Sequence, residues 1–352
     1  MAAREGQATP RRAARLSDVA ARAGVSPGLV SRLLNDDRTL TVRPETREAV
    51  LAAVRELDYV PNSSAASLRR SRTDAIALVL DRVTSPVFAD VVYGAEEAAA
   101  QHGYGLLMAD AEEAERDESF LMGIIKSRRV DGLLLQGGYG PRAAMLARYA
   151  SAVPSVVVNS AGNGSASGVR LEDDAAARLA TQHLIELGHR DIAFVTGTPG
   201  PASDARRRGY EDALASAGLA SRSELTIPAG WQAEDGHHAV ERYLRAHPDG
   251  RATGYVVGTS VAALGVLSAL AAAGIRVPDD ASVVGIHDPW FAPYLVPALT
   301  TVSLPLFELG RRSVEQLITH LRVGRPDEVV ITDPPPLLVL RASTRPPERA
   351  AQ

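Results

Sequence analysis

Two short amphipathic helices are predicted back to back in residues 16–35. Apolar side chains recur there at helical spacing, at Val19, Ala20, Ala23, Val30, Leu33 and Leu34. Ser17 is placed to cap the first helix and Gly24 to end it, while Ser26 and Pro27 are suited to begin the second. Two helices joined by so short a turn form a helix-turn-helix, whose second helix fits a DNA major groove. A surface helical hairpin would show the same pattern, so the assignment depends on the rest of the chain.

The residues around this motif complete a small helical head. Residues 1–14 are rich in Ala, Arg and Pro without periodicity, which predicts a flexible basic arm. Pro44 begins a third helix with one apolar stripe, formed by Val50, Leu51, Val54 and Leu57. Residues 63–70, SSAASLRR, are too few to keep a helix in water on their own. Such a segment is either a plain interdomain linker or one that becomes ordered only when it docks.

From Ala75 onward, buried strands alternate with amphipathic helices. The expected strands are Ala75–Leu80, Tyr104–Met108, Gly132–Leu135, Ser155–Val158, Val169–Leu171, Ile192–Val195, Leu225–Ile227, Gly254–Val257 and Ser282–Ile286. The expected helices are Pro86–His102, Glu115–Arg129, Pro141–Tyr149, Asp173–Leu187, Ala205–Ala217, Glu234–Arg245, Val261–Ala273 and Leu306–Leu321. A Pro-rich strand pair within Glu328–Leu340 finishes the chain. Two successive alternating runs predict an α/β core of two lobes with parallel sheets, and a ligand cleft at the carboxyl ends of the strands.

Composition narrows the function classes. The 352 residues contain no Cys, which excludes disulfides, thiolate zinc sites and Cys nucleophiles. No apolar stretch is long enough to span a membrane and the N-terminus lacks a signal-peptide core, so we expect a cytoplasmic protein. The net charge of −4 is uneven, because residues 1–72 hold 13 Arg and 8 acidic residues, leaving 25 basic and 34 acidic residues for the remainder. A basic head on an acidic body fits a small module that faces a polyanion.

An enzyme on an α/β scaffold is one alternative, and a cytoplasmic small-molecule-binding protein without a DNA-regulatory role is another. The sequence has no G-x-S-x-G elbow and no phosphate-binding G-x-x-x-x-G-K-[ST] loop. His237 and His238 are adjacent, which makes a poor chelating pair, and residues 137–140 are glycine-rich without the dinucleotide-binding spacing. No catalytic residue, metal site or cofactor is therefore expected. A transport-type binding protein would need an export signal.

Several motifs, taken in order, resemble those of the LacI/GalR (lac-repressor-type) family of bacterial transcription regulators. SDVAARAGVSPGLVSRLLN, VRPETREAVLAAVRELDYVPN and SLRRSRT are similar to the head and hinge of the family, and HLIELGHRDIAFVTG, DARRRGYEDAL and ASVVGIHD to its body. The resemblance implies an all-α helix-turn-helix head, a hinge helix and a two-lobed core like periplasmic sugar-binding proteins, which dimerises. The implied boundaries are 1–14 for the arm, 15–61 for the head, 62–72 for the hinge, 73–346 for the core and 347–352 for the tail. Within the core, the first lobe takes 73–171 with 303–330, and the second takes 172–302 with 331–346.

For the head, the resemblance implies a set of DNA contacts. The positions that match phosphate contacts are Leu16, Ser17, Ser26 and Asn35. The family reads bases mainly from two positions that are Pro27 and Gly28 here, and from Ser31 and Arg32. Because Pro27 and Gly28 carry no side-chain donor or acceptor, Arg32 is expected to carry most of the direct readout, bidentate to a guanine, with apolar contact from Pro27 or Leu29.

The hinge segment is implied to fold in the minor groove beside its partner from the other subunit. Leu68 matches the leucine that the family inserts between central base pairs, and the small Ala65 and Ser67 leave room for two helices. We therefore expect a near-palindromic double-stranded DNA operator with a central pyrimidine–purine step, since such steps kink most easily.

For the core, the resemblance implies an effector site between the lobes. The matched positions in the first lobe are Val87, Phe88, Gln136 and Asn159. In the second lobe, Arg206 matches a family arginine, Trp231 an aromatic on which sugar or base rings stack, and Asp288 an acid that accepts ligand hydroxyls. For each residue alone, core packing or a surface ion pair is the commoner explanation, and only the joint pattern indicates a site.

Three departures from the family pattern bear on the effector. Thr259 stands in a Thr-Ser pair where many members have Asn-Asp, Arg82 stands where many have Asp, and His287 precedes Asp288 where a second Asp is frequent. These changes argue against an ordinary neutral hexose. They favour a ligand with a carboxylate or phosphate, with Arg82 and Arg206 as counter-charges.

The expected function is a sequence-specific DNA-binding transcriptional regulator, more specifically a repressor, controlled by a small-molecule effector such as a sugar or sugar-derived metabolite. Ligand in the cleft would favour one arrangement of the lobes and so change the spacing of the paired hinge segments. A coupling of about 1–3 kcal/mol would change operator occupancy roughly 5- to 150-fold. Whether the ligand releases or recruits the protein stays open. No apolar heptad tail follows residue 345, so the sequence supports no assembly beyond a homodimer.

Overall fold

The computed structural model describes residues 14–34, 37, 39–59, 72–137, 140–162, 164–248 and 252–347. The chain divides into two compact units, Met1–Thr73 and Asp74–Gln352, and each is described by itself. No helix in the described ranges is both long and apolar enough to cross a membrane.

The first unit is a three-helix head made of α1 (Leu16–Ala23), α2 (Pro27–Leu34) and α3 (Pro44–Glu56). Its small core is centred on Val19, Val30 and Val50, one from each helix, and all three are fully buried. Three short helices can persist here because their apolar stripes cover one another, which supplies what each helix lacks alone.

The caps of the first two helices differ in one respect from the expectation. Gly24 adopts the left-handed conformation that ends α1, and the Leu29 amide donates to the Ser26 hydroxyl at 3.3 Å, as a cap of α2 should arrange. Ser17, however, lies inside the first turn. The cap of α1 is Arg15, whose amide donates to the Asp18 carboxylate at 2.8 Å, because an acidic side chain three residues into the helix can reach back to that amide.

The second unit contains two six-stranded sheets. The first sheet has the order β11 (Val329–Ile331), β5 (Ser167–Leu171), β4 (Ser155–Val158), β3 (Gly132–Gln136), β1 (Ala75–Leu80) and β2 (Gly105–Asp110), and all neighbours are parallel. Its helices are η1 (Pro86–Phe88), α5 (Ala89–Gln101), α6 (Ala111–Arg116), α7 (Glu118–Lys126), α8 (Gly140–Ala152) and α13 (Leu306–Val323). The apolar runs of β1, β3 and β4 are buried, as strands covered on both faces require.

The second sheet repeats this plan. Its order is β12 (Leu337–Val339), β10 (Thr300–Ser303), β9 (Ser282–Ile286), β8 (Gly254–Val257), β6 (Ile192–Val195) and β7 (Thr226–Ile227), and only β12 is antiparallel to its neighbour. Its helices are α9 (Asp173–Glu186), α10 (Pro201–Ser216), η2 (Ser223–Leu225), α11 (Ala233–Ala246), α12 (Ser260–Ala272) and η3 (Ala292–Tyr294). The chain passes between the sheets three times, after β5, β10 and β11.

Three expectations about the elements of the core are corrected. The strand pair expected in Glu328–Leu340 is wrong: β11 joins the first sheet and β12 the second, because three consecutive prolines, Pro334–Pro336, separate them and cannot form a ladder. The helix expected over Glu115–Arg129 is two helices, since Asp117 caps α7 through the Ser119 amide at 3.0 Å. The strand β10 was not expected.

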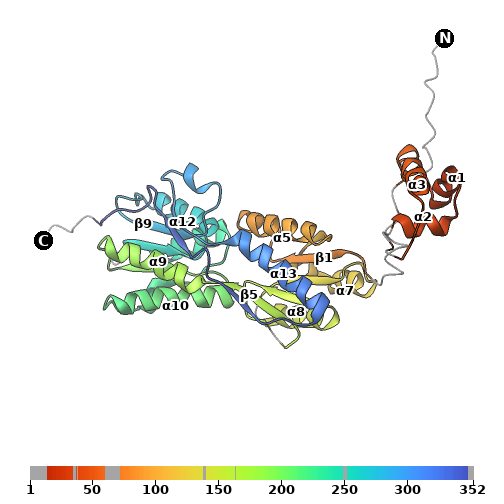
Figure 1. The fold of residues 1–352 in the computed structure, drawn as a ribbon. Helices are drawn as coiled ribbons and strands as arrows, with labels where there is room; N and C mark the ends of the chain where they lie inside the picture. Colours follow the sequence, from red (N-terminus) through yellow and green to blue (C-terminus); the bar gives the residue numbers. More distant parts are fainter. Residues whose placement is uncertain are drawn as a thin grey trace, which may run out of the picture. The chain divides into compact units, whose positions relative to one another are not determined.

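Two helices far apart in sequence, α5 and α13, lie side by side in the first lobe (Figure 1). Glycines permit this close crossing. A Cβ on Gly94 would lie 2.0 Å from the Phe307 carbonyl oxygen, and one on Gly310 would lie 2.0 Å from the Val91 carbonyl oxygen. The last long helix of the chain is thereby held against the first helix of the core.

We expect Gly310→Ala to destabilise the core by about 1–3 kcal/mol, because the added methyl group would push two backbones apart. Gly123→Ala is the matched control: it lies within α7 and a Cβ there meets nothing within 4 Å. That substitution should stabilise the protein by about 0.5–1 kcal/mol. Urea unfolding monitored by circular dichroism measures both, and equal effects would contradict the close-crossing argument.

Candidate functional site

A cavity lies between the two lobes of the core, at the carboxyl ends of β1, β3, β4, β8 and β9. This is where ligands bind open parallel sheets. Eight of the nine side chains expected to contact an effector line this cavity: Arg82, Val87, Phe88, Gln136, Asn159, Arg206, Trp231 and Thr259. The first five come from the first lobe and the last three from the second. A wider mouth shares Gln136, Asn159 and Trp231 with the cavity and also includes Glu115 and Glu118.

A buried ion pair organises the polar wall of this cavity. The Arg206 Nε donates to the Asp173 carboxylate at 2.8 Å, and both side chains are almost fully buried. The other Asp173 oxygen accepts from the Asn159 amide at 3.0 Å, while the Asn159 carbonyl accepts from the Leu171 amide at 3.1 Å. Asp173 begins α9 of the second lobe and Asn159 follows β4 of the first, so one carboxylate bridges the lobes. Sequence reasoning missed Asp173, because an acidic residue at a helix start is ordinarily explained by the helix dipole.

Arg206 uses its remaining donors within the second lobe. Its guanidinium donates to the Gly258 carbonyl oxygen and, at 2.9 Å, to the His287 Nε2. The same group lies 5.4 Å from the centre of the Trp231 ring, within the range of a cation–π interaction. Gly197 allows the ring to lie there, since a Cβ at this position would come within 2.1 Å of the indole. Arg206 therefore fixes the loop after β8, the loop after β9 and the indole ring.

The expected role of Asp288 is not supported by its position. Asp288 does not line the cavity. Its carboxylate accepts from the Thr301 hydroxyl at 2.7 Å and from the Arg341 guanidinium at 3.0 Å. His287, one residue earlier, lines the cavity in its place. Successive residues at the end of a strand point to opposite sides, so a shift of one residue in the match exchanges a cavity residue for one that faces away.

The two arginines expected as counter-charges for an anionic ligand already have carboxylate partners. Arg206 is paired with Asp173, and Arg82 is paired with Glu112 at 3.1 Å. The Arg206–Asp173 pair is buried, whereas the Arg82–Glu112 pair is about two-fifths exposed. Neither guanidinium is a free positive charge in the cavity, so the geometry removes the argument for a carboxylate or phosphate ligand.

In the head, most of the expected DNA-contacting residues are exposed at the start of a helix. Ser17, Ser26, Pro27 and Gly28 are exposed, Leu16 is half-buried and Ser31 is buried. Asn35, Ala65 and Leu68 lie outside the described residues. Arg32, on α2, is half exposed, and its Nε donates to the Asp37 carboxylate at 2.7 Å. Hydrogen bonds from Thr39 and Arg32 lower the pKa of Asp37 to about 2, so this partner is charged at any physiological pH.

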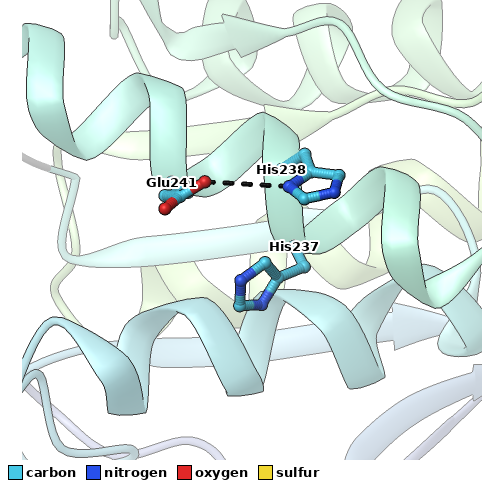
Figure 2. Close-up of side chains that lie close together, drawn as sticks. All are labelled: His237, His238 and Glu241. Atoms are coloured by element: carbon cyan, nitrogen blue, oxygen red, sulfur yellow. Dashed lines mark ion pairs between the residues drawn. The ribbon is translucent and has the colours of Figure 1, made fainter.

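The described residues hold one group of side chains that could bind a metal ion, on the exposed helix α11 (Figure 2). His237 and His238 point in different directions from this helix, and Glu241 approaches His238 at 3.7 Å. Glu241 is also paired with Arg245 at 2.6 Å, and this positive charge disfavours a cation beside it. The group lies outside the cavity and we assign no metal to it.

Comparison with known proteins agrees with this architecture. Residues 15–62 match the model of the bacterial regulatory proteins of the lacI family, and residues 181–344 match that of the periplasmic binding protein-like domain. The HTH-type transcriptional repressor PurR of Erwinia tasmaniensis is 33% identical over 96% of this chain and 98% of its own length. The chain belongs to the LacI family. It is a DNA-binding transcriptional regulator, and its relatives are named repressors rather than enzymes.

Two solved LacI-family structures extend the comparison. The complex of the transcriptional regulator CelR with cellobiose is 32% identical, covers 94% of this chain and 99% of that chain, and has a TM-score of 0.69. The lac repressor dimer bound to operator and the anti-inducer ONPF is 25% identical, covers 95% and 100%, and has a TM-score of 0.79. The fold expectation, a helix-turn-helix head with a two-lobed α/β core, is confirmed.

We expect Asp173→Ala to destabilise the core of this LacI-family protein by about 3–5 kcal/mol, because it leaves the Arg206 charge buried without a partner. Asp174→Ala is the matched control, since the adjacent Asp174 is exposed and pairs with Arg178 at 3.7 Å. That change should cost less than about 1 kcal/mol. Chemical denaturation measures both, and a similar small cost at both positions would contradict the assigned importance of the buried pair.

Acid should destabilise the core partly through His287. Complete burial and the neighbouring Arg206 hold the pKa of folded His287 well below its ordinary value of 6.5, so below that pH the unfolded chain binds the extra proton. The free energy of unfolding therefore falls as the pH falls, by up to about 1.4 kcal/mol per pH unit from this group. The His287→Asn variant should lose less stability than the wild type between pH 7 and pH 5, as measured by denaturation at each pH. An unchanged slope would show that His287 does not contribute.

Proposed function

We propose that this protein is a homodimeric transcriptional repressor that binds a near-palindromic operator and responds to a small, uncharged effector in the interlobe cavity. One observation carries the proposal: a single cavity is lined from both lobes of a core that follows a helix-turn-helix head. A ligand that contacts both lobes binds their arrangements with different affinities, which is the requirement for coupling to a distant site. A protein that acts on chromosomal DNA works in the cytoplasm.

The walls of the cavity support a sugar or sugar-derived effector. Phe88 and Trp231 come from opposite lobes and offer ring faces, while Gln136, Thr259 and His287 offer polar groups. Aromatic faces with a few convergent polar groups are suited to ring compounds with hydroxyl or carbonyl oxygens. Because the cavity arginines are paired with carboxylates, we propose a neutral compound. The cellobiose complex of a relative supports the same class.

A gel-shift assay with the upstream DNA of the gene tests the function directly. We expect the purified protein to retard this duplex but not a shuffled one, and at least one compound of a neutral-metabolite library to change the apparent affinity by about fivefold or more. The Trp231→Ala variant should bind the DNA and lose the response to that compound. Absence of sequence-preferring DNA binding, with or without metabolites, would overturn the proposal.

Arg32→Ala should weaken discrimination at one base pair of the operator by about 1–3 kcal/mol, because the remaining exposed residues at the start of α2 have no side-chain donor to a base edge. Arg22→Ala is the control, since Arg22 lies on α1 and pairs with Glu56 at 2.7 Å. Selection of binding sites from a randomised duplex pool should show relaxed specificity for the first variant only. Full discrimination by Arg32→Ala would contradict the assigned reading role.

Exposed apolar side chains support the homodimer. On the second lobe, Trp290 and Tyr294 are 74% and 79% exposed, and Val296 is almost fully exposed. On the first lobe, Leu107 and Met108 are exposed on the edge strand β2. Large apolar groups gathered on one element of a folded core indicate a protein partner, and aromatic residues commonly dominate such interfaces. The lac repressor, which was solved as a dimer on its operator, supports a second copy of this chain as that partner.

Tyr294→Lys combined with Trp290→Lys should weaken dimerisation at least about tenfold, because two charges would be buried at the interface. Val323→Lys is the control, since this exposed apolar residue ends α13 without such neighbours. Sedimentation equilibrium measures the dissociation constants. A double variant that remains dimeric at the wild-type concentration would place the interface elsewhere.

A further inference from the structure

His287 occupies a special backbone position at the cavity wall. It follows β9 with a φ of 72°, in the left-handed region. Its amide donates to the Val302 carbonyl oxygen at 2.8 Å, and the Ser260 hydroxyl donates to the Ile286 carbonyl oxygen at 3.0 Å and also contacts the His287 carbonyl. The imidazole is therefore held in place by its own backbone. Only a few residue types other than glycine, chiefly Asn, Asp and His, adopt this conformation readily.

The protonation of this imidazole follows from its neighbour. Its Nε2 lies 2.9 Å from a nitrogen of the Arg206 guanidinium, which can only donate, so Nε2 must accept. Burial and the positive charge of Arg206 lower the pKa of His287, which keeps the ring neutral. A neutral ring that accepts at Nε2 carries its proton on Nδ1. Nδ1 is buried and has no hydrogen-bond partner among the described residues.

A buried donor without a partner calls for an explanation, and a bound ligand supplies one. We propose that the Nδ1–H of His287 donates a hydrogen bond to the effector, and that the cavity therefore selects a compound with an acceptor-only oxygen at this point, such as the carbonyl of a sugar lactone. This inference rests on the proposed function. A carboxylate at the same position, as in relatives with a second Asp, could only accept and would require a hydroxyl hydrogen instead.

Two substitutions separate the donor from the shape of the site. His287→Asn keeps an N–H donor, and its carbonyl can accept from Arg206, whereas His287→Asp offers acceptors only. Asn and Asp are nearly equal in size and both tolerate the left-handed backbone, so they differ mainly in hydrogen-bond polarity. His238→Asn on α11 is the matched control outside the cavity. Thermal unfolding without ligand verifies that each variant is folded.

The probes are sugars paired with their own 1,4-lactones: D-ribose, D-xylose, D-arabinose and D-galactose, titrated by calorimetry. We expect the wild type and the His238→Asn control to bind at least one lactone roughly tenfold or more tightly than its parent sugar. His287→Asn should keep this preference in direction, and His287→Asp should lose or reverse it. Nitrogen NMR of histidine-labelled protein should show the proton on Nδ1, and this resonance should shift when the lactone binds.

Several results would overturn the inference while leaving the proposed function intact. These are a proton on Nε2, a parent sugar that binds as tightly as its lactone, a panel in which no lactone binds, or a lactone preference that survives in His287→Asp. In each case the gel-shift response to another metabolite would still support an effector-controlled repressor. Loss of that response, together with loss of operator binding, would overturn the function itself.

Discussion

The buried pair between Arg206 and Asp173 is the interaction on which the geometry of the core depends. A guanidinium taken out of water must find partners for all of its donors, and here they reach a carboxylate, the Gly258 carbonyl and the His287 ring. Because the same carboxylate accepts from Asn159, an element of the first lobe enters the network. The relative position of the lobes is thus tied to hydrogen bonds that are sensitive to distance and angle.

This network also determines what the cavity can recognise. The positive charge of Arg206 is cancelled by Asp173 and the imidazole stays neutral, so the wall presents oriented hydrogen-bond groups rather than net charge. Recognition then depends on ring faces and on the direction of each hydrogen bond. Such a wall costs little reorganisation when a ligand enters, because its side chains are already held by one another. A ligand that bridges the lobes acts on an arrangement that is already cooperative.

Much of the fold was predictable from the sequence, and the exceptions have physical reasons. Strands such as Ala75–Leu80, Ser155–Val158 and Gly254–Val257 were placed correctly, because a strand buried on both faces is a continuous apolar run with clear ends. The cavity residues Arg206 and Trp231 were found through motifs of the family. Asp173 was missed, since burial of a carboxylate depends on a partner 33 residues away. His287 was passed over for Asp288, because the family pattern places an acid at both positions and only the pleat decides which one faces the cavity.

The head applies the same physical rule at its surface. Arg32 is available to a base only when it exchanges Asp37, a carboxylate that stays charged because its pKa is about 2. A guanine edge offers two acceptors in the geometry of the guanidinium fork and can replace that carboxylate, whereas an incorrect base cannot. Phosphate contacts at the helix starts hold the head on any sequence, and the exchange of Arg32 adds a penalty wherever the base is wrong. In both units, an arginine with an internal carboxylate partner restricts which ligand can bind.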